Sequence, residues 1–310
     1  MVKVFVDGSA GTTGLRIYER LETLGGIEII RLPEEKRKDI SSRKAAINES
    51  DFSFLCLPDD AAREAVAMVE NPNTAIIDTS TAHRVSFGWA YGFPELSAAH
   101  YDAIASSKRV AVPGCHAGGF IALVYPLVKA GVIKKDALLS AFSLTGYSGG
   151  GKKMISAYGD ADRPTLYGAP RQYALTQTHK HLPEMTKISG LDNAPAFCPI
   201  VADFYSGMEV TVPLFASDIR GTAEDIKEIY KSTYKGGLVK YDDSADDDGF
   251  LSAVAMAGRD DMKVGVYGNG ERILLVSRFD NLGKGASGAA LQCLNIMRGA
   301  NMTDGLVTGE

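Results

Sequence analysis

The N-terminal residues hold the pattern that most constrains the fold: a short β-rich run over 2–6, a glycine-rich turn and an amphipathic helix. Gly8, Gly11 and Gly14 have the spacing G-x-x-G-x-x-G. A tight strand-to-helix turn requires glycine, and so does close approach of the backbone to a pyrophosphate, which the helix N-terminus then binds. The pattern predicts a dinucleotide-binding domain; the alternative is three glycines in a surface turn. Further hydroxyl contacts to phosphate are expected from Ser9, Thr12 and Thr13.

Strands and helices continue to alternate after this turn. Residues 51–57 and 74–78 are β-like, and a helix over 61–69 begins after Pro58-Asp59-Asp60, where aspartate can cap it. This alternation predicts a parallel sheet with right-handed crossovers, and therefore an α/β domain. Cys56 lies within a predicted strand and is expected to be core. A chain of 310 residues is long enough for a second domain with its own core.

The end of the second predicted strand, 26–30, indicates which dinucleotide is bound. An NAD-selective fold usually has an acidic residue near this point to bind the ribose 2′-hydroxyl. This chain has Arg31, and Lys36, Arg37 and Lys38 follow. Because arginine fits a 2′-phosphate, the sequence predicts NADPH rather than NADH. The alternative is a solvated basic loop.

Cys115 is the candidate nucleophile. It follows Pro113-Gly114 and precedes the apolar run 120–125, which predicts a helix that ends near Gly131. A cysteine in the first turn of a helix meets the positive end of the helix dipole and several unpaired N–H groups. These features favour the thiolate and supply donors for an oxyanion, which suits covalent catalysis at an acyl carbon. The alternative is a small buried apolar residue.

The second half of the chain predicts an α+β domain with a mixed or antiparallel sheet. Its strand-like runs are separated by a glycine-rich loop, by one long helical stretch and by loops. A final small-residue helix, 286–297, is expected to pack back on the first domain. The predicted strands are 137–145, 197–203, 208–215 and 272–280, and the helix is 223–234. The predicted domains are 1–112 with 286–310 for NADP binding, and 113–285 for catalysis and oligomerisation.

Two histidines and one arginine complete the candidate site. A histidine near a thiol is the usual base partner, and His179 and His181 are both candidates. They lack the further clustered ligands of a zinc site, so no metal is predicted. Arg84 lies in a loop after a parallel strand, where ligands bind, and can hold a carboxylate or phosphate. The alternative is an arginine on a surface turn.

Composition excludes several classes of partner. The net charge of −5 gives no reason to expect nucleic acid or an anionic membrane surface. No apolar stretch is long enough to span a membrane, and the first residues show no signal-peptide pattern. The four cysteines are scattered, which together with these features predicts reduced thiols in the cytoplasm. The acidic run 242–248 reads as a solvated loop.

Five segments together resemble the N-acetyl-γ-glutamyl-phosphate reductases, NADPH-dependent enzymes of arginine biosynthesis, and the shorter of their two subtypes most closely. The resemblance runs through nearly the whole chain and implies a Rossmann domain plus a catalytic domain like that of glyceraldehyde-3-phosphate dehydrogenase. It also implies a homo-oligomer, either a homodimer or a homotetramer. The segments are 7–14, 91–96, 113–115, 179–184 and 280–286.

The resemblance implies a reaction in which the Cys115 thiolate attacks N-acetylglutamyl 5-phosphate, inorganic phosphate leaves, and NADPH reduces the thioester to the 5-semialdehyde. His181 or His179 is the base, and Leu182-Pro183 favours His181 because it pins the backbone. The same chemistry on aspartyl phosphate or on N-acetyl-aminoadipyl phosphate is an alternative, and so is a non-catalytic NADPH sensor. Residues implied to flank the nicotinamide are Ser148, Gly149, Gly150 and Asn281. Residues implied to contact the substrate are Ser80, Arg84 and His116, although 80–84 lacks the acidic residue that the family has in this loop, which leaves the role of His83 open.

Overall fold

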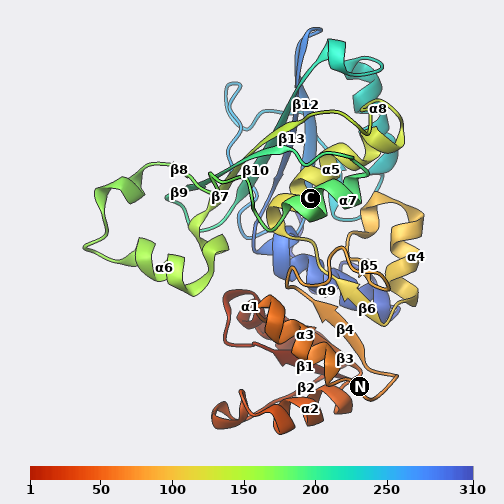
Figure 1. Cartoon of the computed structure of the whole chain (residues 1–310), viewed down its shortest axis with the longest axis vertical. Coiled ribbons are helices and arrows are strands. Elements are labelled where there is room, and N and C mark those ends of the chain that lie inside the picture. The colour runs from red at the N-terminus through yellow and green to blue at the C-terminus, as the bar shows by residue number, and fades with distance from the viewer. Residues whose placement is uncertain (310) are drawn as a thin grey trace. The chain divides into compact units, whose positions relative to one another are not determined.

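A computed structural model describes residues 1–309, and these form two compact units (Figure 1). The first unit comprises Met1–Pro94, Ala98–Gly114 and Ala286–Leu306. The second comprises Glu95–Ser97, Cys115–Gly285 and the residues from Val307 onward. The sequence predicts those last residues in the first domain. They group with the second because the Asp260 backbone N–H donates to the Val307 carbonyl at 2.7 Å, and Val307 N–H donates to the Asp260 carboxylate.

The first unit is built on a six-stranded sheet in which every pairing is parallel. The order is β2-β1-β3-β4-β6-β5. Both faces are apolar, because neighbouring residues along the central strands, such as Val4 and Phe5, are buried in different core clusters. The strands are β1 (Val2–Asp7), β2 (Ile27–Ile30), β3 (Phe52–Leu55), β4 (Ala75–Asp78), β5 (Ala90–Tyr91) and β6 (Arg109–Ala111).

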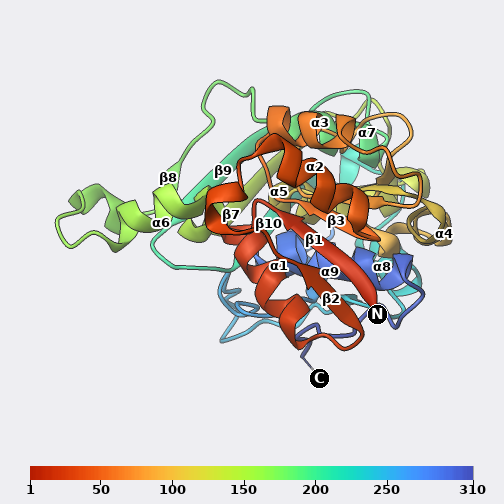
Figure 2. The same ribbon diagram turned by 90° about the horizontal axis from the view of Figure 1, so that it is seen from below.

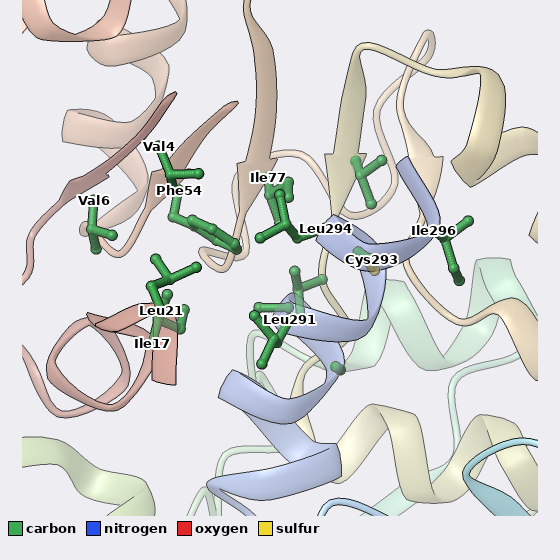
Figure 3. Packing of buried hydrophobic residues seen from close by; sticks show 14 of the residues in the cluster. Val4, Val6, Ile17, Leu21, Phe54, Ile77, Leu291, Cys293, Leu294 and Ile296 are labelled. Carbon is green, nitrogen blue, oxygen red and sulfur yellow. The ribbon is translucent and has the colours of Figure 1, made fainter. Parts of the chain in front are cut away.

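Helices cover both faces of this sheet. Figure 2 shows α2 and α3 on one side of β1 and β3, with α1 and α9 on the other. The core on the α9 side joins Leu291 and Leu294 to Phe54 and Ile77 of the sheet (Figure 3). Helix α9 therefore packs on the first unit, although it lies near the end of the chain. The helices of this unit are α1 (Thr12–Thr23), α2 (Ile40–Glu49), α3 (Asp59–Ala67), α4 (Ala98–Ser106) and α9 (Gly288–Met297).

The second unit contains a seven-stranded mixed sheet of order β11-β12-β13-β10-β7-β9-β8. The pairs β7–β9 and β11–β12 are parallel and the other pairs are antiparallel. The predicted fold class, a Rossmann domain plus an α+β domain with a mixed sheet, is confirmed. The strands are β7 (Ser140–Gly146), β8 (Arg171–Gln172), β9 (Ala196–Ala202), β10 (Met208–Phe215), β11 (Val239–Tyr241), β12 (Met262–Gly268) and β13 (Arg272–Phe279).

Three helices lie together on one face of the mixed sheet (Figure 1). Helix α5 packs on β10 and β13 and contacts α7 and α8, while α6 projects past the edge formed by β8 and β9 in both views. The helices are α5 (Cys115–Lys129), α6 (Gly151–Gly159), α7 (Leu182–Ser189) and α8 (Ala223–Thr233). Among residues 1–309, none of the helices combines the length and the apolar content that crossing a bilayer requires.

Helix α5 contains a proline, and the second unit compensates for it. Pro126 has no N–H, so the Ala122 carbonyl one turn earlier loses its helical donor. The buried Tyr234 hydroxyl donates to that carbonyl at 2.6 Å, and the Tyr230 hydroxyl donates to the Leu123 carbonyl at 2.6 Å. The central helix therefore keeps its buried carbonyls satisfied and remains a rigid support for its first residue, Cys115.

Candidate active site

Steric contacts require glycine at two positions of the first turn. Gly8 has φ +86°, and a Cβ atom there would lie 2.2 Å from the Cys56 carbonyl oxygen. A Cβ at Gly14 would lie 2.3 Å from the Gly8 carbonyl oxygen. At Gly11 the nearest atom would be 3.4 Å away, so sterics alone do not demand glycine there. The turn therefore brings the start of α1 against the end of β1.

The start of α1 has unused donors that suit a phosphate. The first-turn N–H groups of a helix have no partner within the helix, and Gly11 at its N-cap has no side chain to offer one. The Thr12 hydroxyl is buried and has no hydrogen-bond partner among residues 1–309. Thr13 follows it in the same turn and is partly buried. These features fit the pyrophosphate of a dinucleotide.

A cavity of about 830 Å³ lies beside this turn. Gly8, Ser9 and Arg31 all line it, so three of the predicted cofactor residues share one cavity. Arg31 directly follows β2, donates to the Glu22 carboxylate at 3.0 Å and lies 5.4 Å from the Tyr18 ring centre. Additional basic lining residues are Arg37, Lys38 and Arg43. The cavity therefore fits a dinucleotide that carries an additional phosphate.

Arg43 is a part of this cavity that the sequence analysis missed. Its guanidinium is buried and donates to the Asp7 carboxylate, which ends β1 directly before Gly8. Burial is the main cause that raises the pKa of Asp7, and the Arg43 charge opposes it. Asp7 and Arg43 both line the cavity. No local sequence motif predicts this ion pair, because the arginine comes from α2 and the aspartate from β1.

The loop after β4 is organised around one buried carboxylate. Asp78 accepts from the Ser80 hydroxyl at 2.7 Å and lies 2.6 Å from His83 Nδ1, and the His83 ring stacks on Trp89 at 4.1 Å. Arg84 is buried and donates to the carbonyls of Val112 and Thr79, residues that follow β6 and β4. His83 thus anchors the loop through Asp78, while substrate contacts by Ser80 and Arg84 stay a prediction.

Cys115 is the first residue of α5, as predicted, and close packing on the sheet places it there. A Cβ at Gly119 would lie 2.6 Å from Val210, 2.8 Å from the Phe279 ring and 2.9 Å from the Ser277 hydroxyl. Only glycine lets the helix approach β10 and β13 this closely. The partly exposed thiol therefore sits at a helix N-terminus that the sheet holds fixed.

The segment after β13 forms a wall against Cys115. A Cβ at Gly285 would lie 2.9 Å from the Cys115 Cβ and 3.1 Å from the Asp280 carbonyl oxygen. The buried Asp280 carboxylate accepts from the Leu282 N–H at 2.7 Å, from the Ser206 hydroxyl and from the Gly258 N–H. These contacts fix the turn that brings Gly285 to the thiol.

A buried ion pair holds the same segment from its other side. Lys284 Nζ lies 2.8 Å from both carboxylate oxygens of Glu95, and the two side chains are only 3% and 4% exposed. A buried pair in this geometry must stay matched, because removal of one partner leaves an uncompensated charge. Both residues lie in segments that resemble the reductase family, but their sequence context predicts no role for either of them.

His179 and His181 lie together beside Cys115's neighbour His116. The ring centres of His179 and His181 are 4.8 Å apart. They lie 5.7 Å and 5.6 Å, respectively, from the ring centre of His116. The Phe197 ring of β9 contacts both His116 and His179. The structure therefore places the two histidines that are candidate bases next to the first turn of α5, which carries the predicted nucleophile.

The loop that precedes the two histidines has a strained backbone, and one side chain holds it in place. Ala174 and Gln177 have φ +52° and +56°, a conformation that L-residues rarely adopt. The Gln177 amide donates to the Phe197 carbonyl at 2.7 Å and accepts from the Phe197 N–H at 2.9 Å. Those two bonds pin the strained loop to β9.

His116 lies inside the cluster rather than open to a substrate. Its ring is buried; Nδ1 lies 2.6 Å from the Ser143 hydroxyl and Nε2 lies 2.7 Å from the Tyr173 hydroxyl. Burial is the main cause that lowers the pKa of His116 to about 3, and nearby Lys180 acts in the same direction. Since both nitrogens have protein partners, the direct substrate contact expected for His116 has no open atom to make it.

Asn281 joins the glycine-rich loop after β7 to the turn after β13. Its amide donates to the Ser148 hydroxyl at 3.0 Å and accepts from the Gly207 N–H at 2.9 Å. A Cβ at Gly149 would lie 3.5 Å from the Asn281 amide nitrogen, and Gly150 is exposed next in the chain. The structure thus brings together the four residues implied to flank a nicotinamide.

Within residues 1–309, no group of three or more His, Cys, Asp or Glu side chains is placed to hold a metal ion. The acidic run forms ion pairs within the chain instead. Asp242 pairs with Lys263 at 2.5 Å, and Asp246 pairs with the buried Arg278.

Comparisons with known proteins agree with this geometry. Residues 3–104 match the family model of the semialdehyde dehydrogenase NAD binding domain, and residues 115–281 match that of the semialdehyde dehydrogenase dimerisation domain. Among solved structures, a probable aspartate-semialdehyde dehydrogenase from Pseudomonas aeruginosa aligns with a TM-score of 0.72 at 15% identity, covering 96% of this chain and 98% of its own. Aspartate semialdehyde dehydrogenase II from Vibrio cholerae aligns with a TM-score of 0.70 at 15% identity, with the same coverage. The fold and the matched domains define a semialdehyde dehydrogenase.

Similar sequences narrow the family further. The N-acetyl-γ-glutamyl-phosphate reductase of Rhizobium meliloti is 44% identical over 308 residues, which cover 96% of this chain and 99% of its own. N-acetyl-γ-glutamyl-phosphate reductase 2 of a Nostoc species is 42% identical over 312 residues, covering 96% and 97%. The chain therefore belongs to the N-acetyl-γ-glutamyl-phosphate reductase family.

The wall against Cys115 yields a prediction. Gly285→Ala adds a methyl group that must displace the Cys115 Cβ, and we expect kcat to fall by roughly 10²-fold, the cost of a displacement of about 1 Å. We also expect the rate at which iodoacetamide alkylates Cys115 to change, because the added methyl group displaces this residue. Gly270→Ala is the matched control, because its added Cβ meets no atom within 4 Å. Equal activity of the two variants would show that the wall does not position the thiol.

Proposed function

We propose that this chain catalyses the NADPH-dependent reductive dephosphorylation of N-acetylglutamyl 5-phosphate to N-acetylglutamate 5-semialdehyde, a step of arginine biosynthesis. The observation that carries the proposal is Cys115 at the fixed N-terminus of α5, beside the cluster of His116, His179 and His181. The similarity to curated reductases across nearly the whole chain supports the substrate.

The chain's own residues account for the acyl transfer. The Cys115 thiolate attacks the acyl carbon, a C–S bond forms, the bond to the phosphate oxygen breaks, and inorganic phosphate leaves. N–H groups at the start of α5 hold the acyl oxygen as it gains negative charge. NADPH, when bound, supplies the hydride that reduces the thioester. A protonated histidine gives its proton to the oxyanion that this reduction leaves, which forms the thiohemiacetal. The same histidine, now neutral, takes the hydroxyl proton back as the C–S bond breaks, which releases the aldehyde and restores the Cys115 thiolate.

His181 is the better candidate for the proton-transferring base. His179 Nδ1 accepts from the His181 backbone N–H at 3.2 Å, so a neutral His179 carries its proton on Nε2. Burial and the Lys180 charge lower the pKa of His179 and keep it neutral. His179 therefore presents an N–H donor to a ligand, whereas the base must present a lone pair. The rigid start of α7, with Pro183 in its first turn, holds His181.

The cofactor is NADP(H), bound at the turn that begins with Gly8. The unpartnered Thr12 hydroxyl and the first turn of α1 support binding of the pyrophosphate, and Arg31, Arg37 and Lys38 along the cavity support binding of a 2′-phosphate. Ser148, Gly149, Gly150 and Asn281 remain the residues proposed to flank the nicotinamide.

The open face of the mixed sheet supports a homodimer, or a homotetramer built from such dimers. Helices α5, α7 and α8 lie on one face of the mixed sheet, and side chains on the other face are partly exposed. That face carries apolar side chains from β7 and β13, the two strands that flank β10, and Phe142 and Leu274 are 46% and 41% exposed. A second copy of the chain that stacks its own sheet here would bury them. The matched dimerisation domain agrees, and we place the enzyme in the cytoplasm.

Two other substrates and one other role remain as alternatives. An acyl phosphate with a shorter or longer chain, aspartyl phosphate or N-acetyl-aminoadipyl phosphate, would use the same residues, because one methylene changes binding by only ~1–3 kcal/mol. A non-catalytic NADPH sensor would leave the cluster around Cys115 without a use. The assay below separates all of these.

The direct test is the reaction in reverse, followed by NADPH absorbance. With N-acetylglutamate 5-semialdehyde, NADP and phosphate, we expect NADPH to form only when phosphate is present. Cys115→Ser should lower turnover by several orders of magnitude and leave NADPH binding intact, because it removes the nucleophile alone. Activity only with aspartate semialdehyde or the longer homologue would change the substrate, and silence with all three would favour the sensor.

Arg31 yields a separate prediction about the cofactor. Arg31→Ala removes a cation from the proposed 2′-phosphate site, so the KM for NADPH should rise far more than the KM for NADH. Arg16→Ala is a suitable control, because Arg16 is a basic residue of α1 that does not line the cavity. An equal effect of Arg31→Ala on both cofactors would remove the 2′-phosphate role.

A further inference from the structure

A chain of two short hydrogen bonds runs from the mixed sheet toward the catalytic helix. Ser143 of β7 is fully buried, and its hydroxyl lies 2.6 Å from His116 Nδ1. His116 Nε2 lies 2.7 Å from the hydroxyl of Tyr173, which directly follows β8. Ser143 lies in β7 and Tyr173 directly follows β8, and both strands pair with β9, so the sheet fixes the two ends of this hydrogen-bond chain.

Burial fixes the direction of these hydrogen bonds. Within residues 1–309 the Ser143 hydroxyl has one acceptor in reach, His116 Nδ1, and a buried hydroxyl proton without an acceptor is costly. Ser143 therefore donates to Nδ1. Because a pKa near 3 keeps the ring neutral, its single proton is then on Nε2. Nε2–H donates to the Tyr173 oxygen, so the phenolic proton must point elsewhere.

The phenolic proton is free to meet a ligand beside Cys115. No other hydrogen bond of the Tyr173 hydroxyl occurs within the described residues. His116, which binds the Tyr173 hydroxyl, directly follows Cys115 in the chain. The centre of the Tyr173 ring lies 6.0 Å from that of the His179 ring. Burial and the nearby Cys115 thiolate raise the pKa of Tyr173, so the phenol keeps its proton.

We propose that the Tyr173 hydroxyl is a further catalytic group, which donates a hydrogen bond to the acyl oxygen of the substrate on Cys115. Ser143 and His116 are positioning residues, because they set the direction of that donor. The substrate is the acyl phosphate of the proposed function, on which this inference rests. Tyr173 then complements the N–H groups of α5, because a donor held in place before the reaction stabilises the charge that develops on the acyl oxygen.

The test compares two reactions of the Cys115 thiolate in the full-length protein. In acylation by p-nitrophenyl acetate, the thiolate attacks the carbonyl carbon, the ester C–O bond breaks and p-nitrophenolate leaves, so charge develops on the acyl oxygen. In alkylation by iodoacetamide, the thiolate displaces iodide from a saturated carbon, and no oxyanion forms. Rates at Cys115 are obtained by subtraction of the rates of Cys115→Ser.

Tyr173→Phe should slow acylation by roughly 10²-fold, the usual cost of one lost oxyanion donor, and leave alkylation unchanged. His116→Gln should retain more of the acylation rate than His116→Phe, because the glutamine amide can still donate toward Tyr173. Tyr241→Phe is the matched control. It removes a tyrosine hydroxyl, bonded to Asp243, from the strand at the opposite edge of the sheet, and should change neither rate.

Three results would overturn the proposal. The first is an acylation rate of Tyr173→Phe equal to that of the wild-type protein. The second is an equal loss of acylation and alkylation, which would indicate a structural role, and the third is an absence of acylation in the wild-type protein. The ester assay uses neither NADPH nor the natural substrate. Failure of the proposed function would instead appear as a wild-type protein that reacts with the ester but oxidises none of the three semialdehydes.

Discussion

The close contact between α5 and the mixed sheet is the constraint on which the candidate site depends. A cysteine at a helix N-terminus is useful only if the helix does not move, and Gly119 allows α5 to press against β10 and β13. The Tyr234 hydroxyl donates to the Ala122 carbonyl, which the proline of this helix leaves without a helical donor. Gly285 then closes the space beside the thiol, and the buried Glu95–Lys284 pair holds the segment that carries it. Packing, more than any single side chain, therefore determines where Cys115 lies.

Local patterns predicted much of the fold. Strands β1, β3 and β4 and the glycine turn followed from short apolar runs and glycine spacing, and contacts at Gly8 and Gly14 show the steric reason. Helix α2 was missed because its residues are mostly polar and small, so it shows little periodicity. Strands β5 and β6 were missed because they have two and three residues and are recognisable only by their pairing with each other and with β4.

The sequence predicted only those residues of the candidate site whose side-chain type by itself indicates a chemical role. Cys115 and the histidine pair belong to that class, and the structure places them in one cluster. The partners of His116 do not, because Ser143 and Tyr173 are 27 and 57 residues away and meet it only through the order of strands in the sheet. Glu95 and Lys284 are 189 residues apart. Hydrogen bonds over such separations leave no pattern in one sequence.

The proposed reaction requires that Cys115 carries the acyl group. The most direct measurement is the intact mass of the protein after mixing with N-acetylglutamyl phosphate in the absence of NADPH, followed by peptide mapping. We expect one N-acetylglutamyl group per chain, bound through a thioester to Cys115 and discharged when NADPH is added. If the protein turns over substrate but never carries this adduct, or carries it on another residue, Cys115 is not the nucleophile.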